Sequence, residues 1–393
     1  MKLKKEITFI YNDKAEEQLM RPICKEAEKR GYKVTMTTDK YRKSEIGFYC
    51  QHKNFPQFSK FSVIMLHDII QAYGRWPDIW YLEPWNKYNI GILPGNRWVE
   101  NWNQCSQIFY TRPKNGMYKV GWPKADILAG IDGKSNKVEF YEKHGMDINK
   151  PTVLYAPAWE NDGKQDDFVK AMLELDVNIL IKQAPFNEKE FPHICENIKE
   201  MYELHKNVER VTILDVTENI FTAIALSDIL VSEESSTMCE AVLMGVPAVS
   251  VSDWLIPDTT PSRYPKDDYD FVTKTTVKEL KQCISDLLSD YDKYKNDAVE
   301  YSSYNYSNIG TTSKIIMDII DSYVEGKDVP VEEVKANKHQ KISLKKYIQF
   351  KLVCAKREIT ENYVKRFKIL NAIYNVYRRL IHKPYVKMEK SEN

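Results

Sequence analysis

The chain has 393 residues, of which 43% are hydrophobic and 29% are charged, with a net charge of +1. This length allows two domains with separate cores, and the composition is that of an ordinary globular protein. No run of about 18 apolar residues occurs, and the apolar part of the opening MKLKKEITFIYN is too short for a signal peptide, so we expect a cytoplasmic protein. Seven cysteines stand singly, without metal-ligand spacing, which favours reduced thiols over disulfides or a zinc site.

The net charge conceals an asymmetry between the body and the end of the chain. Residues 338–393 contain 15 Lys and Arg but only four Asp and Glu, a net charge of +11, which leaves −10 on the rest of the chain. A strongly basic tail on an acidic body predicts that the tail has an anionic partner of its own.

Short apolar runs alternate with helical patterns along the first third of the chain. A helix is predicted at residues 15–31, closed by Gly31, and strands are predicted at 6–12, 32–38, 46–51, 61–68, 89–95 and 107–111. Alternating β and α units predict a mostly parallel sheet with helices on both faces.

A second series of the same kind begins near Lys150. Strands are predicted at 151–157, 177–185, 211–216, 229–233 and 247–252, with helices between them. We therefore predict two Rossmann-like α/β domains, at residues 1–145 and 146–330, followed by a basic helical tail at 331–393. A ligand shared by two such domains binds outside the carboxyl ends of the strands. Residues 119–151, rich in Gly, Lys and Asp, are interpreted as the hinge, and two domains without a common ligand are the alternative.

Polar residues gather where the strand predicted at 229–233 meets a helix beginning near Met238. Ser235, Ser236 and Thr237 occupy the N-cap and the first turn, where free backbone N–H groups and the helix dipole favour an anion such as a diphosphate. Glu240 follows within the first turn, where its carboxylate suits a ribose diol. The alternative is an ordinary capped helix, in which a serine is the N-cap and Glu240 offsets the dipole.

Three segments in order resemble the CDP-glycerol glycerophosphotransferase family, whose members build teichoic-acid and capsule polymers on the two-domain GT-B glycosyltransferase fold. The segments are VGWPKADIL (120–128), VLYAPAWEND (153–162) and LSDILVSEESSTMCEAVLMGVPAV (226–249). Three motifs in the same order are more specific than any one of them. The resemblance implies a donor site in the second domain, formed by Tyr155, Ala156, Pro157, Lys182, Ser235, Ser236, Thr237 and Glu240.

Two positions depart from the pattern of that family. The family has a His-Gly pair at the end of a strand of the first domain, and here His67 matches while Asp68 replaces the glycine. We predict that His67 or Asp68 removes a proton from the acceptor, although a histidine without a chemical role is the alternative. The family also has a Lys-x-His-Pro element, in which Ala184 here replaces the histidine after Lys182, and this leaves room for a nucleotide sugar as donor.

The segment YGRWPDIWYLEPWNKYNIG (73–91) interleaves aromatic and polar residues without a clean period. Aromatic faces stack on sugar rings and cations meet acceptor phosphates, so Arg75, Trp76 and Lys87 are predicted to bind the acceptor, although aromatic residues are more often part of a core. No metal or other cofactor is predicted, because a helix dipole and a lysine can offset the charge of a leaving diphosphate.

The tail contains one apolar stripe, spaced as on a helix and flanked by Lys and Arg. Its residues are Tyr363, Phe367, Leu370, Tyr374, Tyr377 and Ile381. Three interpretations are open: the tail lies on an anionic membrane, it packs on the first domain, or it binds nucleic acid. Of these, nucleic acid is the least favoured.

Together these observations predict a GT-B transferase at the inner face of the cell membrane. It would move a glycosyl or polyol-phosphate group from a nucleotide-activated donor to a polysaccharide, teichoic-acid-type or lipid-linked acceptor. The alternatives are a sugar-nucleotide 2-epimerase, a DNA-modifying glycosyltransferase and an inactive GT-B binding protein. The sequence predicts no oligomeric state.

Overall fold

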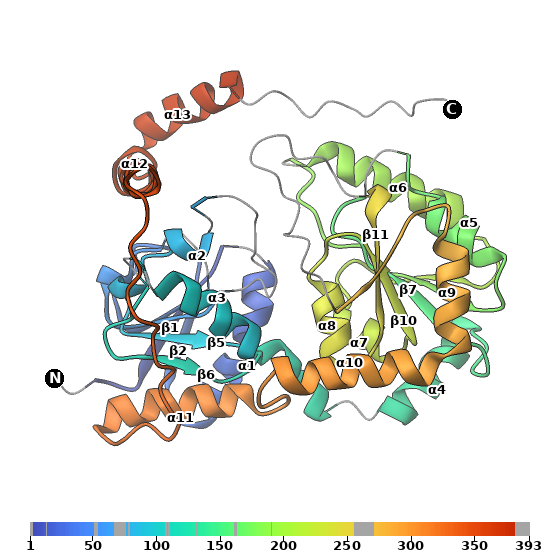
Figure 1. Cartoon of the computed structure of the whole chain (residues 1–393), viewed down its shortest axis with the longest axis horizontal. Helices are drawn as coiled ribbons and strands as arrows, with labels where there is room; N and C mark the ends of the chain where they lie inside the picture. Colours follow the sequence, from blue (N-terminus) through green and yellow to red (C-terminus); the bar gives the residue numbers. More distant parts are fainter. Residues whose placement is uncertain are drawn as a thin grey trace.

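The computed structural model describes residues 3–12, 14–50, 54–66, 76–77, 79–106, 108, 111–130, 133–160, 163–189, 191–254 and 271–381. Two six-stranded parallel sheets stand side by side, each with helices packed on its faces (Figure 1). The predicted α/β class with two Rossmann-like sheets is therefore confirmed. All seven cysteines lie in the described part of the chain, and none of them forms a disulfide bond.

The first sheet has the strand order β2-β1-β3-β4-β5-β6. Its strands are β1 (Glu6–Ile10), β2 (Lys33–Thr37), β3 (Ser44–Tyr49), β4 (Ser59–Ile64), β5 (Ile90–Leu93) and β6 (Met117–Lys119). The helices between them are α1 (Lys14–Lys29), α2 (Ile79–Leu82) and α3 (Asn96–Ser106), with short turns η1 (Pro56–Phe58) and η2 (Trp85–Lys87). The strand predicted at 107–111 falls mostly outside the described residues. The strand beside β5 is instead β6, whose three residues are too few to show a period.

The second sheet has the order β12-β11-β10-β7-β8-β9. Its strands are β7 (Thr152–Tyr155), β8 (Asn178–Ile181), β9 (Val211–Ile213), β10 (Ile229–Ser232), β11 (Ala248–Val251) and β12 (Thr273–Thr275). Its helices are α4 (Gly133–His144), α5 (Asp167–Leu173), α6 (Pro192–His205), α7 (Ile220–Ala225), α8 (Thr237–Leu243) and α9 (Leu280–Ser289), with the turn η4 (Ser252–Trp254). β7, β8, β10 and β11 are buried along their whole length, as expected for strands covered on both faces.

Two long helices then carry the chain from the second sheet back to the first (Figure 1). They are α10 (Tyr291–Asn305) and α11 (Thr312–Glu325). The buried face of α11 joins the core of the first sheet, and Arg30, which directly follows α1, contacts Asp318 at 2.7 Å and Asp321 at 2.8 Å. Residues 312–325 thus pack with the first domain, although the predicted second domain runs to residue 330. Amphipathic spacing in the sequence predicts that a helix has a buried face, but it does not predict against which sheet that face packs.

The segment interpreted as a hinge contains an ordered joint, η3 (Pro123–Gly130). Asp126 accepts hydrogen bonds from the first backbone N–H groups of α11, at 2.8 Å from Thr312 and 2.6 Å from Ser313. Gly121 has a φ of +139°, and a Cβ there would lie 2.4 Å from the carbonyl oxygen of Ser307. The VGWPKADIL segment therefore fastens the returning chain to the first domain.

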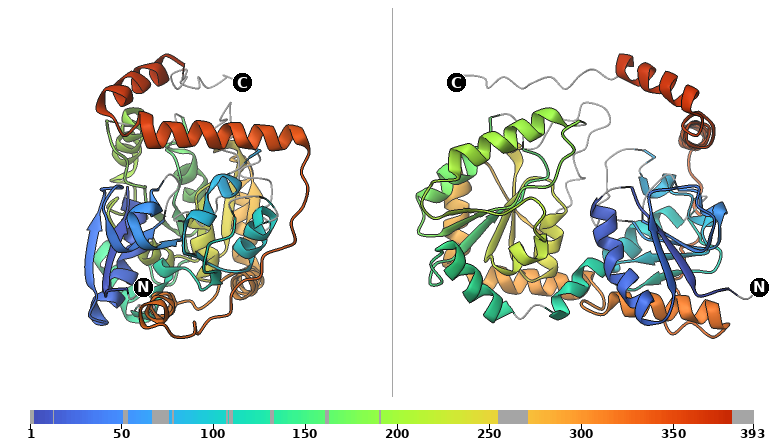
Figure 2. Two further views of the ribbon diagram at one scale, coloured as in Figure 1. Left: turned by 90° about the vertical axis from the view of Figure 1, so that its left-hand side faces the viewer. Right: turned by 180° about the vertical axis from the view of Figure 1, so that it is seen from behind.

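The tail forms two helices rather than one continuous stripe. They are α12 (Leu344–Ile359) and α13 (Lys368–Ile381), separated by a π-helical turn, η5 (Thr360–Val364). α12 lies across the first domain with Phe350 fully buried, whereas α13 projects away from the body (Figure 2). No helix in the described part of the chain is both long enough and apolar enough to span a membrane.

The cap on α11 can be tested by substitution of Asp126. We expect Asp126→Ala to lower the free energy of unfolding by about 1–2 kcal/mol, because two helix N–H groups lose their acceptor. Asp126→Asn, which keeps one amide oxygen, should cost less. Urea unfolding measures both, with Asp328→Ala as the control, since Asp328 is an exposed residue just beyond the same helix. An Asp126→Ala protein as stable as the control would disprove the capping role.

Candidate active site

The carbonyl oxygen of Ala156 ties together the ends of two neighbouring strands of the second sheet. Ala156 directly follows β7, and its oxygen accepts hydrogen bonds from the hydroxyls of Ser232, at 2.8 Å, and Thr237, at 3.1 Å. Ser232 ends β10 and Thr237 begins α8. The first turn of α8 is therefore held against the carboxyl end of β7, where the predicted donor residues Tyr155, Ala156 and Pro157 lie.

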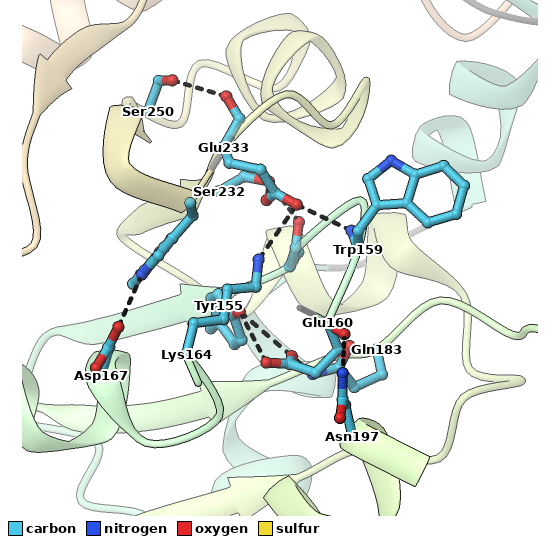
Figure 3. A network of polar contacts seen from close by, with 12 residues as sticks. Tyr155, Trp159, Glu160, Lys164, Asp167, Gln183, Asn197, Ser232, Glu233 and Ser250 are labelled. Carbon is cyan, nitrogen blue, oxygen red and sulfur yellow. Dashed lines mark hydrogen bonds and ion pairs between the residues drawn. The ribbon is translucent and has the colours of Figure 1, made fainter. Parts of the chain in front are cut away.

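The carboxylate of Glu233 makes a second tie between the same two loops (Figure 3). It accepts a hydrogen bond from the backbone N–H of Trp159 at 2.9 Å and contacts Nζ of Lys164 at 3.4 Å. Its own carbonyl oxygen accepts from Ser250 at 2.7 Å, which adds the end of β11. Glu233 is 1% exposed and Lys164 4%, so this ion pair is buried. Glu233 is not among the residues predicted from the sequence, although it lies in the polar run that raised the donor-site hypothesis.

A second buried carboxyl, Glu160, lies at the base of this network (Figure 3). It accepts from the Tyr155 hydroxyl at 3.3 Å and from the Gln183 side-chain amide. Burial raises its pKa to about 7, and the positive charge of Lys164 offsets only part of that rise. Glu160 therefore changes charge near neutral pH, within hydrogen-bonding contact of the residue that ends β7.

The three predicted phosphate-binding hydroxyls lie together in one turn, but they differ in their contacts. Ser235 accepts from the backbone N–H of Thr237 at 3.3 Å, and Thr237 bonds to Ala156. Ser236 occupies the N-cap position of α8 but makes no capping hydrogen bond with its side chain. Ser236 is partly exposed. α8 begins at Thr237, one residue before the predicted start.

Glu240 is paired across the two domains. Its Oε1 lies 2.6 Å from Nζ of Lys124, which belongs to η3, and Glu240 is only 2% exposed. The predicted contact between Glu240 and a ribose stays a prediction, since in this structure one oxygen already has a lysine as partner. Lys124 was missed at the sequence level, although it stands inside the VGWPKADIL motif. The pair brings the ammonium group of Lys124 close to the first turns of α8.

Lys182 lies at the end of β8, next to β7, with its ammonium group turned towards backbone oxygens. Its Nζ donates to the carbonyls of Gln183 at 2.8 Å and Val216 at 3.0 Å. Burial lowers its pKa to about 8. Within the described residues, Lys182 makes no hydrogen bond to the hydroxyls of the α8 turn, so its role at phosphate stays a prediction.

An aromatic cluster covers the ends of β7 and β8. The ring of Trp159 lies 5.4 Å from that of Phe186 and 5.6 Å from that of Phe191, measured between centroids. All three side chains are partly exposed. Since Glu233 holds the Trp159 backbone, this cluster has a fixed place beside the turn of hydroxyls.

On the first domain, His67, Asp68 and Arg75 lie outside the described residues, so the predicted base and one predicted acceptor residue stay predictions. Trp76 and Lys87 are both engaged by the tail. The Trp76 indole donates to the Lys346 carbonyl at 3.2 Å, and Nζ of Lys87 lies 3.4 Å from Glu358. Lys87 also lines a cavity of about 200 Å³ between the first domain and α12.

Among the residues that the structure describes, no group of three or more His, Cys, Asp or Glu side chains is arranged to hold a metal ion. The expectation that no cofactor is needed stays a prediction.

The raised pKa of Glu160 predicts how stability depends on pH. Its pKa is about 7 in the folded chain and near 4.5 unfolded, so between these values the folded state holds more protons and loses stability as pH rises. Relative to Glu160→Gln, the wild-type protein should lose about 1 kcal/mol per pH unit from pH 5 to 7. Denaturant unfolding at several pH values measures this difference, and parallel pH profiles for the two proteins would refute it.

Comparison with known proteins places these features in a family. The sequence profile described as CDP-Glycerol:Poly(glycerophosphate) glycerophosphotransferase matches residues 100–320. The teichoic acid glycerol-phosphate primase of Staphylococcus aureus (strain NCTC 8325 / PS 47) is 28% identical over 209 residues, which are 50% of this chain and 52% of the relative. The chain thus spans about half the length of the curated relative that it matches.

Solved structures with the same fold include two kinds of enzyme. A variant of the wall teichoic acid polymerase TagF superposes with a TM-score of 0.60 at 12% identity, covering 82% of this chain and 90% of that one. The UDP-GlcNAc 2-epimerase of Neisseria meningitidis, bound to UDP-GlcNAc, gives 0.55 at 16% identity, covering 81% and 100%. At sequence identities this low, the similarity establishes the fold alone. The two superpositions confirm the predicted GT-B architecture. Since the profile matches more than half of its residues, the chain belongs to the CDP-glycerol:poly(glycerophosphate) glycerophosphotransferase family.

Proposed function

We propose that this protein is a transferase that passes a glycerophosphate-type group from a CDP-activated donor to a teichoic-acid-type acceptor. The observation that carries the proposal is the turn of three hydroxyls, Ser235 to Thr237, tied to the end of β7 through Ala156. This turn lies within the segment that the family profile matches. A donor in this family is named as CDP-glycerol, so the proposal takes a cytidine diphosphate as the activated group.

The second domain supplies the donor site in this proposal. The hydroxyl of Ser236 and the N–H groups at the start of α8 donate to the diphosphate, and Lys124 and Lys182 balance its negative charge. The partly exposed ring of Trp159 offers a face on which a pyrimidine can stack. The burial of Glu233 and Glu160 beneath these groups favours a site whose shape exists before the ligand arrives.

The reaction in this proposal is an in-line displacement at phosphorus. The acceptor hydroxyl oxygen forms a bond to the phosphorus of the transferred group, the bond from that phosphorus to CMP breaks, and the hydroxyl proton passes to His67 or Asp68. Positive charge from lysine side chains stabilises the negative charge that grows on the leaving CMP. Trp76 and Lys87 lie on the acceptor side, in the first domain.

The donor site can be tested by measuring thermal stability with CDP, UDP, GDP, ADP and CMP. A ligand that binds only the folded state raises the melting temperature by mass action, and we expect CDP to give the largest shift. Ser236→Ala should weaken CDP binding by about tenfold or more, because a hydrogen bond to a charged phosphate is lost, while leaving the unliganded melting temperature unchanged. Ser303→Ala is the control. It also removes a serine hydroxyl, but one in α10 that donates to the Val299 carbonyl.

The outcomes separate the candidate functions. A largest shift with UDP, together with stabilisation by a UDP-sugar in the absence of an acceptor, would favour the sugar-nucleotide transferase or epimerase alternatives. No shift with any nucleotide, or equal CDP binding by Ser236→Ala and the control, would overturn the proposed donor site.

A further inference from the structure

The cavity of about 200 Å³ beneath α12 lies between the tail and the first domain. α12 crosses the first sheet on the side opposite to α11 (Figure 1). The wall of the cavity is formed by residues within 54–57 and 82–87 of the first domain and within 354–362 of the tail. Sites for drug-sized ligands usually measure about 300–1,000 Å³. This cavity is therefore too small for a whole nucleotide and suits a small molecule or a single unit of a polymer.

Arg357 fixes the tail side of the cavity. Its guanidinium donates to the Leu82 carbonyl at 2.7 Å and lies 3.4 Å from the carboxylate of Glu83, which is fully buried. Glu83 also accepts a hydrogen bond from the Tyr88 hydroxyl at 3.0 Å. Within the described residues, these contacts use two of the five N–H groups of the guanidinium. Arg357 is thus held in place and keeps donors for a ligand.

The wall combines an apolar surface with three carboxamides. Phe55 is buried, and Leu82 and Pro84 are partly buried. The carboxamides belong to Asn54, Gln57 and Asn362. A carboxamide can both donate and accept hydrogen bonds, as can every hydroxyl group, and an aromatic ring packs against the carbon skeleton of a polyol or a sugar. This combination suits a ligand with neighbouring hydroxyl groups.

Lys87 and Glu358 form the charged part of the opening. They lie 3.4 Å apart, and their side chains are 43% and 59% exposed. An ion pair this exposed contributes about 0–1 kcal/mol, so an anionic ligand can replace Glu358 as the partner of Lys87. Glu361, the other carboxylate on the wall, is already paired with Lys365 at 2.8 Å. The two cations on the wall, Lys87 and Arg357, are the types that bind phosphate.

We propose that the cavity beneath α12 binds a small phosphorylated polyol of the glycerophosphate type. Lys87 and Arg357 hold its phosphate, the three carboxamides hold its hydroxyls, and Phe55 packs against its carbons. That this molecule is a unit of the acceptor rests on the proposed function, whereas the binding itself does not depend on it. Because the first domain and the tail both contact the ligand, binding also stabilises the packing of the tail on the body.

Cys354 of α12 lines the cavity and can report whether it is occupied. The full chain is treated with N-ethylmaleimide, with and without glycerol 3-phosphate, and the labelling of each cysteine is followed by mass spectrometry. At about three times its dissociation constant, the ligand should slow the labelling of Cys354 about fourfold, because only the empty cavity reacts. Cys195 and Cys283, which are also partly exposed but belong to the second domain, should react at unchanged rates.

Lys87→Ala tests the phosphate contact. We expect it to weaken the binding of glycerol 3-phosphate, measured by calorimetry, by about tenfold or more, because a charge-assisted hydrogen bond is lost. Lys60→Ala is the matched control and should bind like the wild type. Lys60 is also an exposed lysine of the first domain paired with one glutamate, Glu45, but it does not line the cavity. Cys354→Trp, whose indole fills the cavity, should abolish binding, whereas Cys354→Ala should keep it.

Equal labelling of Cys354 with and without glycerol 3-phosphate, or equal binding by Lys87→Ala and Lys60→Ala, would overturn the proposal. So would equal affinities for inorganic phosphate and glycerol 3-phosphate, since the polyol would then contribute nothing. Glycerophosphoglycerol, a phosphodiester, separates the two sources of the ligand. Tighter binding of this diester supports a polymer unit, and tighter binding of glycerol 3-phosphate supports a free phosphorylated polyol. The CDP-induced shift of the same wild-type protein tests the donor site separately, so either proposal can fail alone.

Discussion

The buried carboxylate of Glu233 makes the interaction on which the proposed donor site depends. It joins the loop after β7 to the loop after β10 by accepting the Trp159 N–H and pairing with Lys164. Removing one partner of a buried ion pair costs about 3–5 kcal/mol, because the other charge is left without compensation. The two hydroxyl bonds to Ala156 fasten the same loops a second time. The hydroxyls of the α8 turn are thus held in place by these contacts beneath them.

A second constraint joins the two sheets. The VGWPKADIL segment contacts the returning chain through Gly121, caps α11 through Asp126 and reaches α8 through Lys124. This motif therefore stabilises the joint between the two sheets and also places the ammonium group of Lys124 beside α8, which is part of the proposed donor site. Because Lys124 pairs with Glu240, a diphosphate near α8 would compete with that carboxylate for the same ammonium group. One pair of side chains, Lys124 and Glu240, thus links the arrangement of the two sheets to the charge of the proposed donor site.

Most strands and the start of α8 could be predicted from the sequence. The features that could not be predicted depend on contacts between residues far apart in the chain or on local changes of helix type. Apolar runs marked most of the strands, and the polar run after β10 marked α8 to within one residue. The partner of Glu240 could not be predicted, because Lys124 is 116 residues away and only the fold brings the two together. The tail stripe was interpreted as one helix, since periodicity alone does not reveal the π-helical turn at residues 360–364. Of its three interpretations, packing on the first domain holds for the face of α12 that carries Phe350, whereas binding to a membrane or to nucleic acid stays a prediction.

Hydrogen–deuterium exchange with and without CDP tests the central claim most directly, namely that the donor diphosphate binds at the carboxyl ends of β7 and β10. We predict slower exchange in residues 156–160 and 233–243, and unchanged exchange in α12, which lies on the first domain. Slower exchange confined to other segments would contradict this claim. An example is protection of α3 and α10 around the cavity lined by Arg97, Glu300 and Tyr301. Saturating CDP without any protection in these two loops would contradict it as well.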